Sequence, residues 1–277
     1  MFDEAVSTEV VRHFCRIAKN RLGVWIGDNH HPLVAGRVAK RLQALQVDAD
    51  EYLTRLNDDH DCSEVIGFLD FLRPRPPRFF SRREDHAALH TMLVRLLSEG
   101  QRRFRLWSAG CGTGEEPFGM ALTALGAMEA AKVALPDVDL KILATDISKV
   151  VMERGKQGLF DEQQLRDVPR AFHDRYFAAS EGGFAVDESI RDMVRFRRLN
   201  LTKLPYPMTG PLDGIFCHGA LAPLVPSART SVTDAMKDLL AEEGLICTGF
   251  GDATPAPTAD DADGFISRIG PSFRGHC

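Results

Sequence analysis

The run WSAGCGTGEE at residues 107–116 constrains the fold more than any other part of the chain. A short apolar segment precedes it and a long helical pattern follows, so it predicts a tight turn from a strand into a helix. Glycine reaches positive φ angles and lets a ligand approach the backbone, and such a turn lies at the carboxyl end of a strand, where α/β sheets bind ligands. The spacing is G-x-G-x-G rather than the dinucleotide G-x-G-x-x-G, and no lysine follows, so the run is not a phosphate-binding P-loop.

Two acidic residues, Glu115 and Glu116, follow the turn directly. They would repel a pyrophosphate, but they suit the cationic, amine-bearing end of S-adenosylmethionine. We predict that Ala109, Gly110, Gly112 and Gly114 bind this cofactor together with the two glutamates. A simpler interpretation also stays open, in which the run is an ordinary turn and the acids only stabilise the helix N-terminus.

Two further strand ends support an adenosyl cofactor. Asp146 closes the apolar segment 142–145, and an acidic side chain at this place typically binds both hydroxyls of a ribose. Asn200 and Leu201 follow a third strand pattern and would supply an amide and an apolar lid near an adenine ring. The alternatives are that Asp146 caps the helix beginning near Ser148, and that Asn200 is a turn residue.

Strand and helix patterns alternate from residue 103 onward. Five apolar runs have the pattern of strands: FRLWSAG, DLKILATDI, VRFRRLNL, GPLDGIFCHGAL and EEGLICTGFG. A long helix is expected over 114–135. This alternation predicts an α/β, Rossmann-like fold with a parallel sheet covered on both faces. The Ser-Glu-Gly-Gly turn at 180–183 separates two alternating segments, which predicts a small antiparallel β hairpin inserted at about 174–197.

The first 72 residues differ from the rest, because their apolar residues recur at helical spacing. We predict an all-α N-terminal domain at 1–72, a Pro/Arg-rich linker at 73–82 and the cofactor-binding α/β domain at 83–277. Arg37, Lys40 and Arg41 make one predicted helix basic on one side. This side is either a solvated face or a docking surface for an acidic partner.

Composition excludes several classes of protein. The net charge of −5 over 277 residues argues against bulk nucleic-acid binding, which needs a basic face. The 6 cysteines are scattered without a C-x-x-C pair, so neither a metal site nor a disulfide framework is indicated, and Cys217 and Cys247 are expected to be buried thiols. No signal peptide and no membrane-spanning segment is recognisable, so we expect a cytoplasmic protein.

Taken together, these motifs resemble the chemotaxis receptor methyltransferase (CheR) family of S-adenosylmethionine-dependent enzymes. WSAGCGTGEEPF at 107–118 is similar to that family's first cofactor motif almost residue for residue, and ATDI at 144–147, Asn200-Leu201 and LDGIFC at 212–217 are similar to later ones. The order of parts is similar too, over roughly residues 10–275.

The resemblance implies a reaction and a partner. Members transfer a methyl group from S-adenosylmethionine to glutamate side chains on the helical cytoplasmic domain of chemoreceptors, which gives a methyl ester and S-adenosylhomocysteine. It also implies that the basic N-terminal helix docks the acidic receptor, and that the inserted hairpin offers a sheet edge, which in some members captures a receptor tail by strand addition.

The chain departs from the family pattern on the acceptor side. The family has Asn-x-Thr before Phe-Phe-Arg, whereas this chain has RPPRFFS at 75–81 and its basic residue at Arg82. The family has Arg-Asn and then a tyrosine where this chain has His218, Gly219 and Pro223.

These departures leave several accounts open. In the first, Arg78 or Arg82 acts with His218, and we predict Arg82 and His218 as catalytic residues, with His218 and Gly219 also contacting the cofactor. In the second, the protein is a catalytically degenerate relative that binds cofactor or docks to receptors, and His218 is simply a packed histidine. A small-molecule methyltransferase on the same fold is a third.

Overall fold

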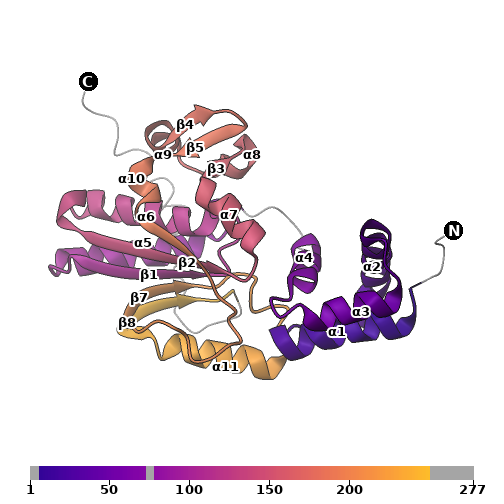
Figure 1. The fold of residues 1–277 in the computed structure, drawn as a ribbon. Helices are drawn as coiled ribbons and strands as arrows, with labels where there is room; N and C mark the ends of the chain where they lie inside the picture. Colours follow the sequence, from indigo (N-terminus) through magenta and orange to yellow (C-terminus); the bar gives the residue numbers. More distant parts are fainter. Residues whose placement is uncertain (1–5, 73–77, 250–277) are drawn as a thin grey trace. The chain divides into compact units, whose positions relative to one another are not determined.

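A computed structural model describes residues 6–72 and 78–249 of the chain (Figure 1). The chain forms two compact units. The helical unit comprises Met1–Pro74, Asn200–Leu204 and Ala220–Asp234, and the sheet unit comprises Arg75–Leu199, Pro205–Gly219 and Ala235–Cys277. The predicted domain boundaries stay a prediction, and residues 73–77 of the predicted linker lie outside the described residues, as does the end of the predicted α/β domain beyond residue 249.

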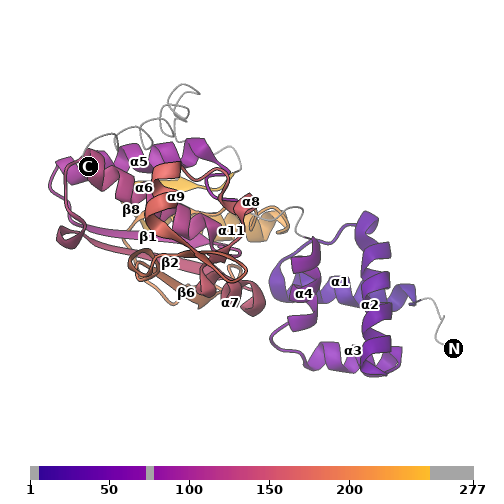
Figure 2. The same cartoon turned by 90° about the horizontal axis from the view of Figure 1, so that it is seen from above.

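Four helices build most of the helical unit, and the first of them contacts each of the other three (Figure 2). Ser7 caps the first helix by accepting a hydrogen bond from the backbone of Val10 at 3.4 Å, and Gly23 ends it in the left-handed region at φ 67°. Phe14 and Phe68 meet edge to face in the core, with ring centroids 5.5 Å apart. The helices are α1 Thr8–Leu22, α2 His31–Leu45, α3 Ala49–Asp58 and α4 Ser63–Leu72, with a short 3-10 turn, η1, at Asp28–His30.

The basic side of α2 is partly used inside the unit. Arg41 donates from Nε to both carboxylate oxygens of Glu64 on α4, at 3.1 and 2.9 Å, and a further contact from its Nη2 is shorter still. Lys40 is exposed. Arg41 therefore stabilises the packing of two helices, and docking by this face stays a prediction.

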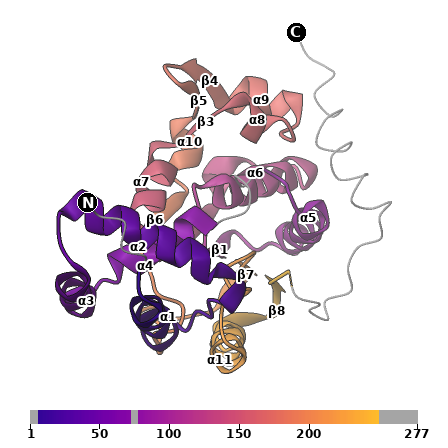
Figure 3. The same cartoon turned by 90° about the vertical axis from the view of Figure 1, so that its right-hand side faces the viewer.

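Five parallel strands form the main sheet of the sheet unit, in the order β6-β2-β1-β7-β8 (Figures 1 and 3). The predicted Rossmann-like parallel sheet is thereby confirmed. Each predicted strand pattern overlaps one of these strands. They are β1 Arg103–Ala109, β2 Asp139–Asp146, β6 Val194–Arg198, β7 Leu212–Phe216 and β8 Leu240–Cys247.

The helix after β1 is the centre of the core. In α6 (Glu115–Ala130), every residue from Pro117 to Met128 is buried, since this helix is apolar on all sides rather than on one stripe. It packs along α5 (Arg83–Ser98) and against β1 and β2. The helical pattern continues to Leu135, but α6 ends at Ala130, and Lys132 then takes a left-handed conformation at φ 56°.

A second, three-stranded antiparallel sheet in the order β3-β5-β4 confirms the predicted insertion (Figure 3). The predicted turn joins its last two strands, with Gly182 at φ 88° and Gly183 at φ 147°. The sequence did not indicate the first strand or the short helices before the hairpin. These elements are β3 Leu159–Phe160, α8 Glu162–Leu165, α9 Arg170–Tyr176, β4 Phe177–Ser180 and β5 Gly183–Val186, between α7 Lys149–Gln157 and α10 Glu188–Arg191.

Candidate functional site

The topology brings the predicted motifs of the sheet unit to one edge of the main sheet. From β1, the chain proceeds in one direction to β2 and β6, and β7 and β8 lie on the other side. The strand order therefore reverses between β1 and β7, and crevices outside the carboxyl ends of strands at such a point are where α/β sheets bind ligands. The glycine turn follows β1, Asp146 ends β2 and His218 follows β7.

All three glycines of the turn have positive φ angles. Gly110, Gly112 and Gly114 have φ angles of 83°, 57° and 103°, in the left-handed region that favours glycine. A Cβ on Gly114 would also lie 3.1 Å from the Phe118 ring and 3.3 Å from the Cα of Gly155. Local backbone geometry thus explains why the motif has this composition.

Asp146 ties this turn to the second strand. Its side chain is 3% exposed, and Oδ2 accepts a hydrogen bond from the backbone N–H of Gly112 at 3.1 Å. Oδ1 accepts from the N–H of Ser148 at 2.9 Å. Ser148, rather than Asp146, is the N-cap of α7, because its hydroxyl accepts from the N–H of Val151. The alternative that Asp146 caps this helix is wrong, and a buried acceptor beside a glycine turn suits a diol.

Glu115 is held inside the sheet unit. Thr113 Oγ1 lies 2.7 Å from each of its carboxylate oxygens, and Gln164 on α8 donates from Nε2 to Oε1. The side chain is fully buried, and this burial raises the pKa of Glu115. Glu115 therefore connects the glycine turn to the inserted segment, and its contact with a cofactor stays a prediction.

Glu116 begins a chain of polar contacts that leads to the predicted catalytic residues. Its Oε1 accepts from the Ser108 hydroxyl at 2.6 Å, and its Oε2 lies 2.6 Å from Nδ1 of His218. The other ring nitrogen of His218, Nε2, lies 2.8 Å from Oδ2 of Asp85 on α5, close enough for an ion pair although outside hydrogen-bond geometry. The same Oδ2 accepts from Nε of Arg82 at 2.7 Å. We call Arg82, Asp85, Glu116 and His218 the four-charge cluster.

The His218 ring is a cation at neutral pH. Burial alone would lower its pKa, but pairing with Asp85 and Glu116 outweighs burial and raises the pKa of His218 to about 9. Burial likewise raises the pKa of Asp85, but His218 and Arg82 outweigh it and hold that pKa at about 2. The side chains of His218, Asp85 and Glu116 are 17%, 18% and 16% exposed, so solvent screens these charges little.

The structure separates the two candidate arginines. Arg78 donates from Nη1 to Asp167 at 3.0 Å, so its side chain is paired with the loop after α8. Arg82, in contrast, shares Asp85 with His218. Of the two arginines left open by the sequence, only Arg82 is thus brought to His218 in the described part of the chain.

The remaining predicted residues end a strand, form a turn or lie in the helical unit. Ala109 is the buried last residue of β1, and Gly219 follows His218 at φ 81°. Asn200 and Leu201 belong to the helical unit, where Oδ1 of Asn200 accepts from the backbone and hydroxyl of Thr202 at 3.0 and 2.9 Å. This is the behaviour of a turn residue, and the roles of Asn200 and Leu201 toward a cofactor stay predictions.

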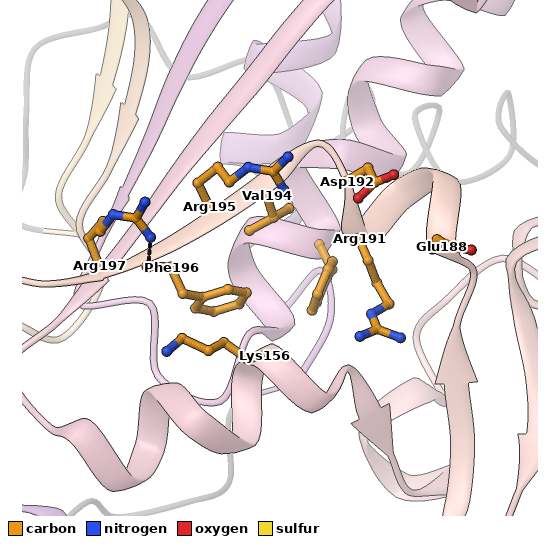
Figure 4. Close-up of a pocket in the computed structure, with 9 residues that line it drawn as sticks. Lys156, Glu188, Arg191, Asp192, Val194, Arg195, Phe196 and Arg197 are labelled. Carbon is orange, nitrogen blue, oxygen red and sulfur yellow. Dashed lines mark hydrogen bonds between the residues drawn. The ribbon is translucent and has the colours of Figure 1, made fainter.

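A cavity of about 300 Å³ lies elsewhere, along β6 at the edge of the main sheet (Figure 4). Phe118 and Phe196 form its apolar part, with Lys156 from α7 and Arg191 from α10 nearby. Arg197 donates to the carbonyl of Phe196 at 3.0 Å. Charged side chains on an edge strand discourage pairing with a foreign strand, so edge protection explains Arg195 and Arg197 of β6. The remaining lining residues are Glu188, Asp192, Val194, Arg195 and Arg197.

Three further findings concern the chemistry of the described residues. No group of three or more His, Cys, Asp or Glu side chains there is arranged to hold a metal ion. No described helix has the length and apolar character of a membrane span. Cys217 and Cys247 are buried, as predicted, and burial raises the pKa of both thiols.

Comparison with known proteins agrees with this geometry. The family model described as "CheR methyltransferase, SAM binding domain" matches residues 77–262. Chemotaxis protein methyltransferase 2 of Pseudomonas aeruginosa is 31% identical over 83% of this chain and 81% of its own. The chemotaxis protein methyltransferases of Escherichia coli and Salmonella typhimurium are 29% and 28% identical, covering 87% and 90% of this chain and 84% and 85% of their own. Among solved structures, PKMT2 from Rickettsia typhi in complex with AdoHcy covers 62% of this chain and 26% of its own, with 20% identity and a TM-score of 0.36, which is too low to carry an argument.

Proposed function

Because the chain belongs to the CheR methyltransferase family, we propose that it transfers a methyl group from S-adenosylmethionine to glutamate side chains of chemoreceptors or related signalling proteins in the cytoplasm. The observation that carries this proposal is the hydrogen bond from Gly112 to Asp146, which joins the first two cofactor motifs at the carboxyl edge of the sheet. The four-charge cluster lies at the same edge, since Glu116 follows the glycine turn directly.

The residues at this edge fit the cofactor. The positive-φ glycines give close access to the backbone, and Asp146 is the acceptor for the two ribose hydroxyls. Glu115 and Glu116 make the start of α6 acidic, which suits an ammonium group rather than a phosphate. The cofactor would supply a methyl group already activated by a positively charged sulfur, so the protein's task is to align an acceptor rather than to provide a strong base.

Arg82 is the residue that we assign to the acceptor. Its Nε is bound to Asp85, and among the described residues its two terminal nitrogens have no hydrogen-bond acceptor. The side chain is 46% exposed, so a carboxylate from another protein can reach it. A guanidinium binds a carboxylate through two parallel hydrogen bonds, which fixes the orientation of the acceptor glutamate. His218 is the buried cation that supports this arginine through Asp85.

The partner is the helical cytoplasmic domain of a chemoreceptor or a related protein. We assign its docking to the exposed basic residues of α2, such as Lys40, because an acidic helical surface complements them. The three-stranded sheet presents β4 as an edge strand, which can take up an extended receptor tail by strand addition.

A second candidate function rests on one specific observation. Glu116, the predicted acceptor for the cofactor's amine, is already paired with Ser108 and His218. A protein whose cofactor groups are satisfied internally would act as a docking or regulatory module without catalysis. Restoring the family residues with His218→Arg and Gly219→Asn separates the two: activity that appears only in the restored protein favours the second candidate.

Binding of S-adenosylhomocysteine tests the cofactor site. We expect calorimetry to show micromolar binding to the wild type and at least about tenfold weaker binding to Asp146→Ala, since hydrogen bonds to a charged group are lost. Asp139→Ala is the matched control, because Asp139 begins the same strand and is half exposed. Equal binding by both variants contradicts the site.

Methyl transfer to a receptor tests the activity. Purified protein, radiolabelled S-adenosylmethionine and cytoplasmic fragments of chemoreceptors from the same organism should give base-labile methyl esters on glutamates. Intact cofactor binding without any labelled carboxylate would refute the enzyme and leave the docking module.

A further inference from the structure

Asp85 occupies a junction that the sequence motifs did not indicate. It lies in the first turn of α5, and one of its oxygens, Oδ2, contacts both Nε of Arg82 at 2.7 Å and Nε2 of His218 at 2.8 Å. Its side chain is only 18% exposed. A single carboxylate oxygen therefore contacts two functional side chains. One is Arg82, which we assign to the acceptor, and the other is His218, which contacts the cofactor motif.

The opposite side of the His218 ring is fixed as firmly. Nδ1 lies 2.6 Å from Glu116, and Phe216 packs edge-on at a centroid distance of 5.3 Å. With a carboxylate at each nitrogen and an aromatic ring beside it, the imidazole has one orientation. Removal of either acid would free one end of the ring.

Charge balance in this cluster favours the imidazolium. Arg82 and His218 carry two positive charges, and Asp85 and Glu116 carry two negative ones, so the loss of the His218 proton would leave a net negative charge on two carboxylates that are mostly buried. The neighbouring groups do not supply a replacement. Burial lowers the pKa of His86 to about 3, so that ring is neutral, and the thiol of Cys247, which lies near Asp85, has its pKa raised by burial and is also uncharged.

We propose that Asp85 is a positioning residue, which aims the Arg82 guanidinium and, together with Glu116, clamps the His218 ring as a cation between the acceptor side and the cofactor motif. The inference rests on the proposed function in so far as Arg82 and Glu116 are assigned there to the acceptor and the cofactor. The clamp itself is a property of the four-charge cluster and is measurable without any receptor.

The test uses Asp85→Asn, which keeps the shape of the side chain and removes its charge. Glu84→Gln is the matched control, since Glu84 is the preceding residue of α5 and is exposed. The full-length protein is labelled at the histidine ring carbons, and the His218 signal is assigned from its loss in His218→Gln. We expect His218 to titrate near pH 9 in the wild type and in Glu84→Gln, and at least about one pH unit lower in Asp85→Asn.

A second readout follows function. In methyl-transfer assays, Asp85→Asn should raise KM for the receptor fragment more than it lowers kcat, because Arg82 loses its anchor, and Asp85→Glu should recover part of the loss. If Asp85→Asn does not fold, Asp85→Glu takes its place in the titration, where a retained carboxylate should keep the His218 midpoint above pH 8.

Two results would overturn the proposal: a wild-type His218 that titrates near its ordinary value, or a midpoint unchanged in Asp85→Asn. The outcome is distinguishable from failure of the proposed function. If the titration moves as expected while the wild type methylates no receptor, the clamp stands and the assigned reaction does not.

Discussion

The charge on His218 gives this protein an unusual dependence of stability on pH. A histidine whose pKa is higher in the folded than in the unfolded chain stabilises the fold while it is protonated. The pKa of His218 is about 9 against an ordinary value of 6.5. Its contribution should therefore be complete below about pH 6.5, and it should disappear as the pH rises through 9.

The size of the effect follows from the same shift. One pKa unit corresponds to about 1.36 kcal/mol, so raising the pKa of His218 from 6.5 to about 9 contributes about 3 kcal/mol to the free energy of unfolding. The side chain is 17% exposed, so little of this is lost to solvent screening. The lowered pKa of Asp85 arises from the same ion pair. The stability that it contributes is lost as the pH falls through about 2, and this contribution is not added to that of His218, because the interaction would be counted twice.

Urea unfolding of the wild type and His218→Gln at pH 6.5 and pH 10 measures this contribution. Fluorescence of Trp107, which is fully buried in β1, follows the sheet unit, and Trp25→Phe removes the 60% exposed tryptophan of the helical unit from the signal. Between the two pH values, the wild type should lose about 3 kcal/mol more than His218→Gln, in which no imidazole can titrate. Parallel losses in both proteins would refute the reasoning, because other titrating groups would then account for the whole dependence.

Four other substitutions test the backbone geometry, the packing and the polar contacts of the protein. Gly183→Ala should destabilise the sheet unit by about 1–3 kcal/mol in urea unfolding, because φ is 147° and the added Cβ would lie 2.3 Å from the carbonyl oxygen of Phe160. In the control Gly36→Ala on α2, the added Cβ meets no atom within 4 Å, so this substitution should stabilise the protein by about 0.5–1 kcal/mol. Phe79→Ala should lower the free energy of unfolding by about 3–5 kcal/mol, since this buried ring packs edge-on against Phe160 at a centroid distance of 4.9 Å. A decrease of less than about 1 kcal/mol would contradict this packing. Glu115→Gln should lower the free energy of unfolding by about 1–3 kcal/mol and weaken S-adenosylhomocysteine binding in calorimetry, because the amide has one acceptor oxygen and no charge, whereas Thr113 contacts both carboxylate oxygens; unchanged affinity and stability would show that these contacts are dispensable.

Local features of the sequence were sufficient for the fold class. Alternating strand and helix patterns predict a parallel sheet because the two periods differ, and glycines predict turns because other residues are strained there. The sheet, the glycine turn and the hairpin turn at Gly182 follow from this kind of information. Helix α3 was not predicted from the sequence, since its two buried residues, Tyr52 and Leu56, make too short an apolar stripe to recognise.

The partners of the site's charged side chains were decided only by the tertiary structure. The sequence favours Arg82 but leaves Arg78 open beside it, and it gives no indication of Asp85. Glu116 and His218 are 102 residues apart, and they meet because β1 and β7 are neighbours in the sheet and end at the same edge. Spacing along the chain determines which residues share a helix face or a turn, but the strand order determines which loops meet. The contacts of His218 with Glu116 and Asp85, the raised pKa of His218 and the role that we propose for Asp85 all depend on that order.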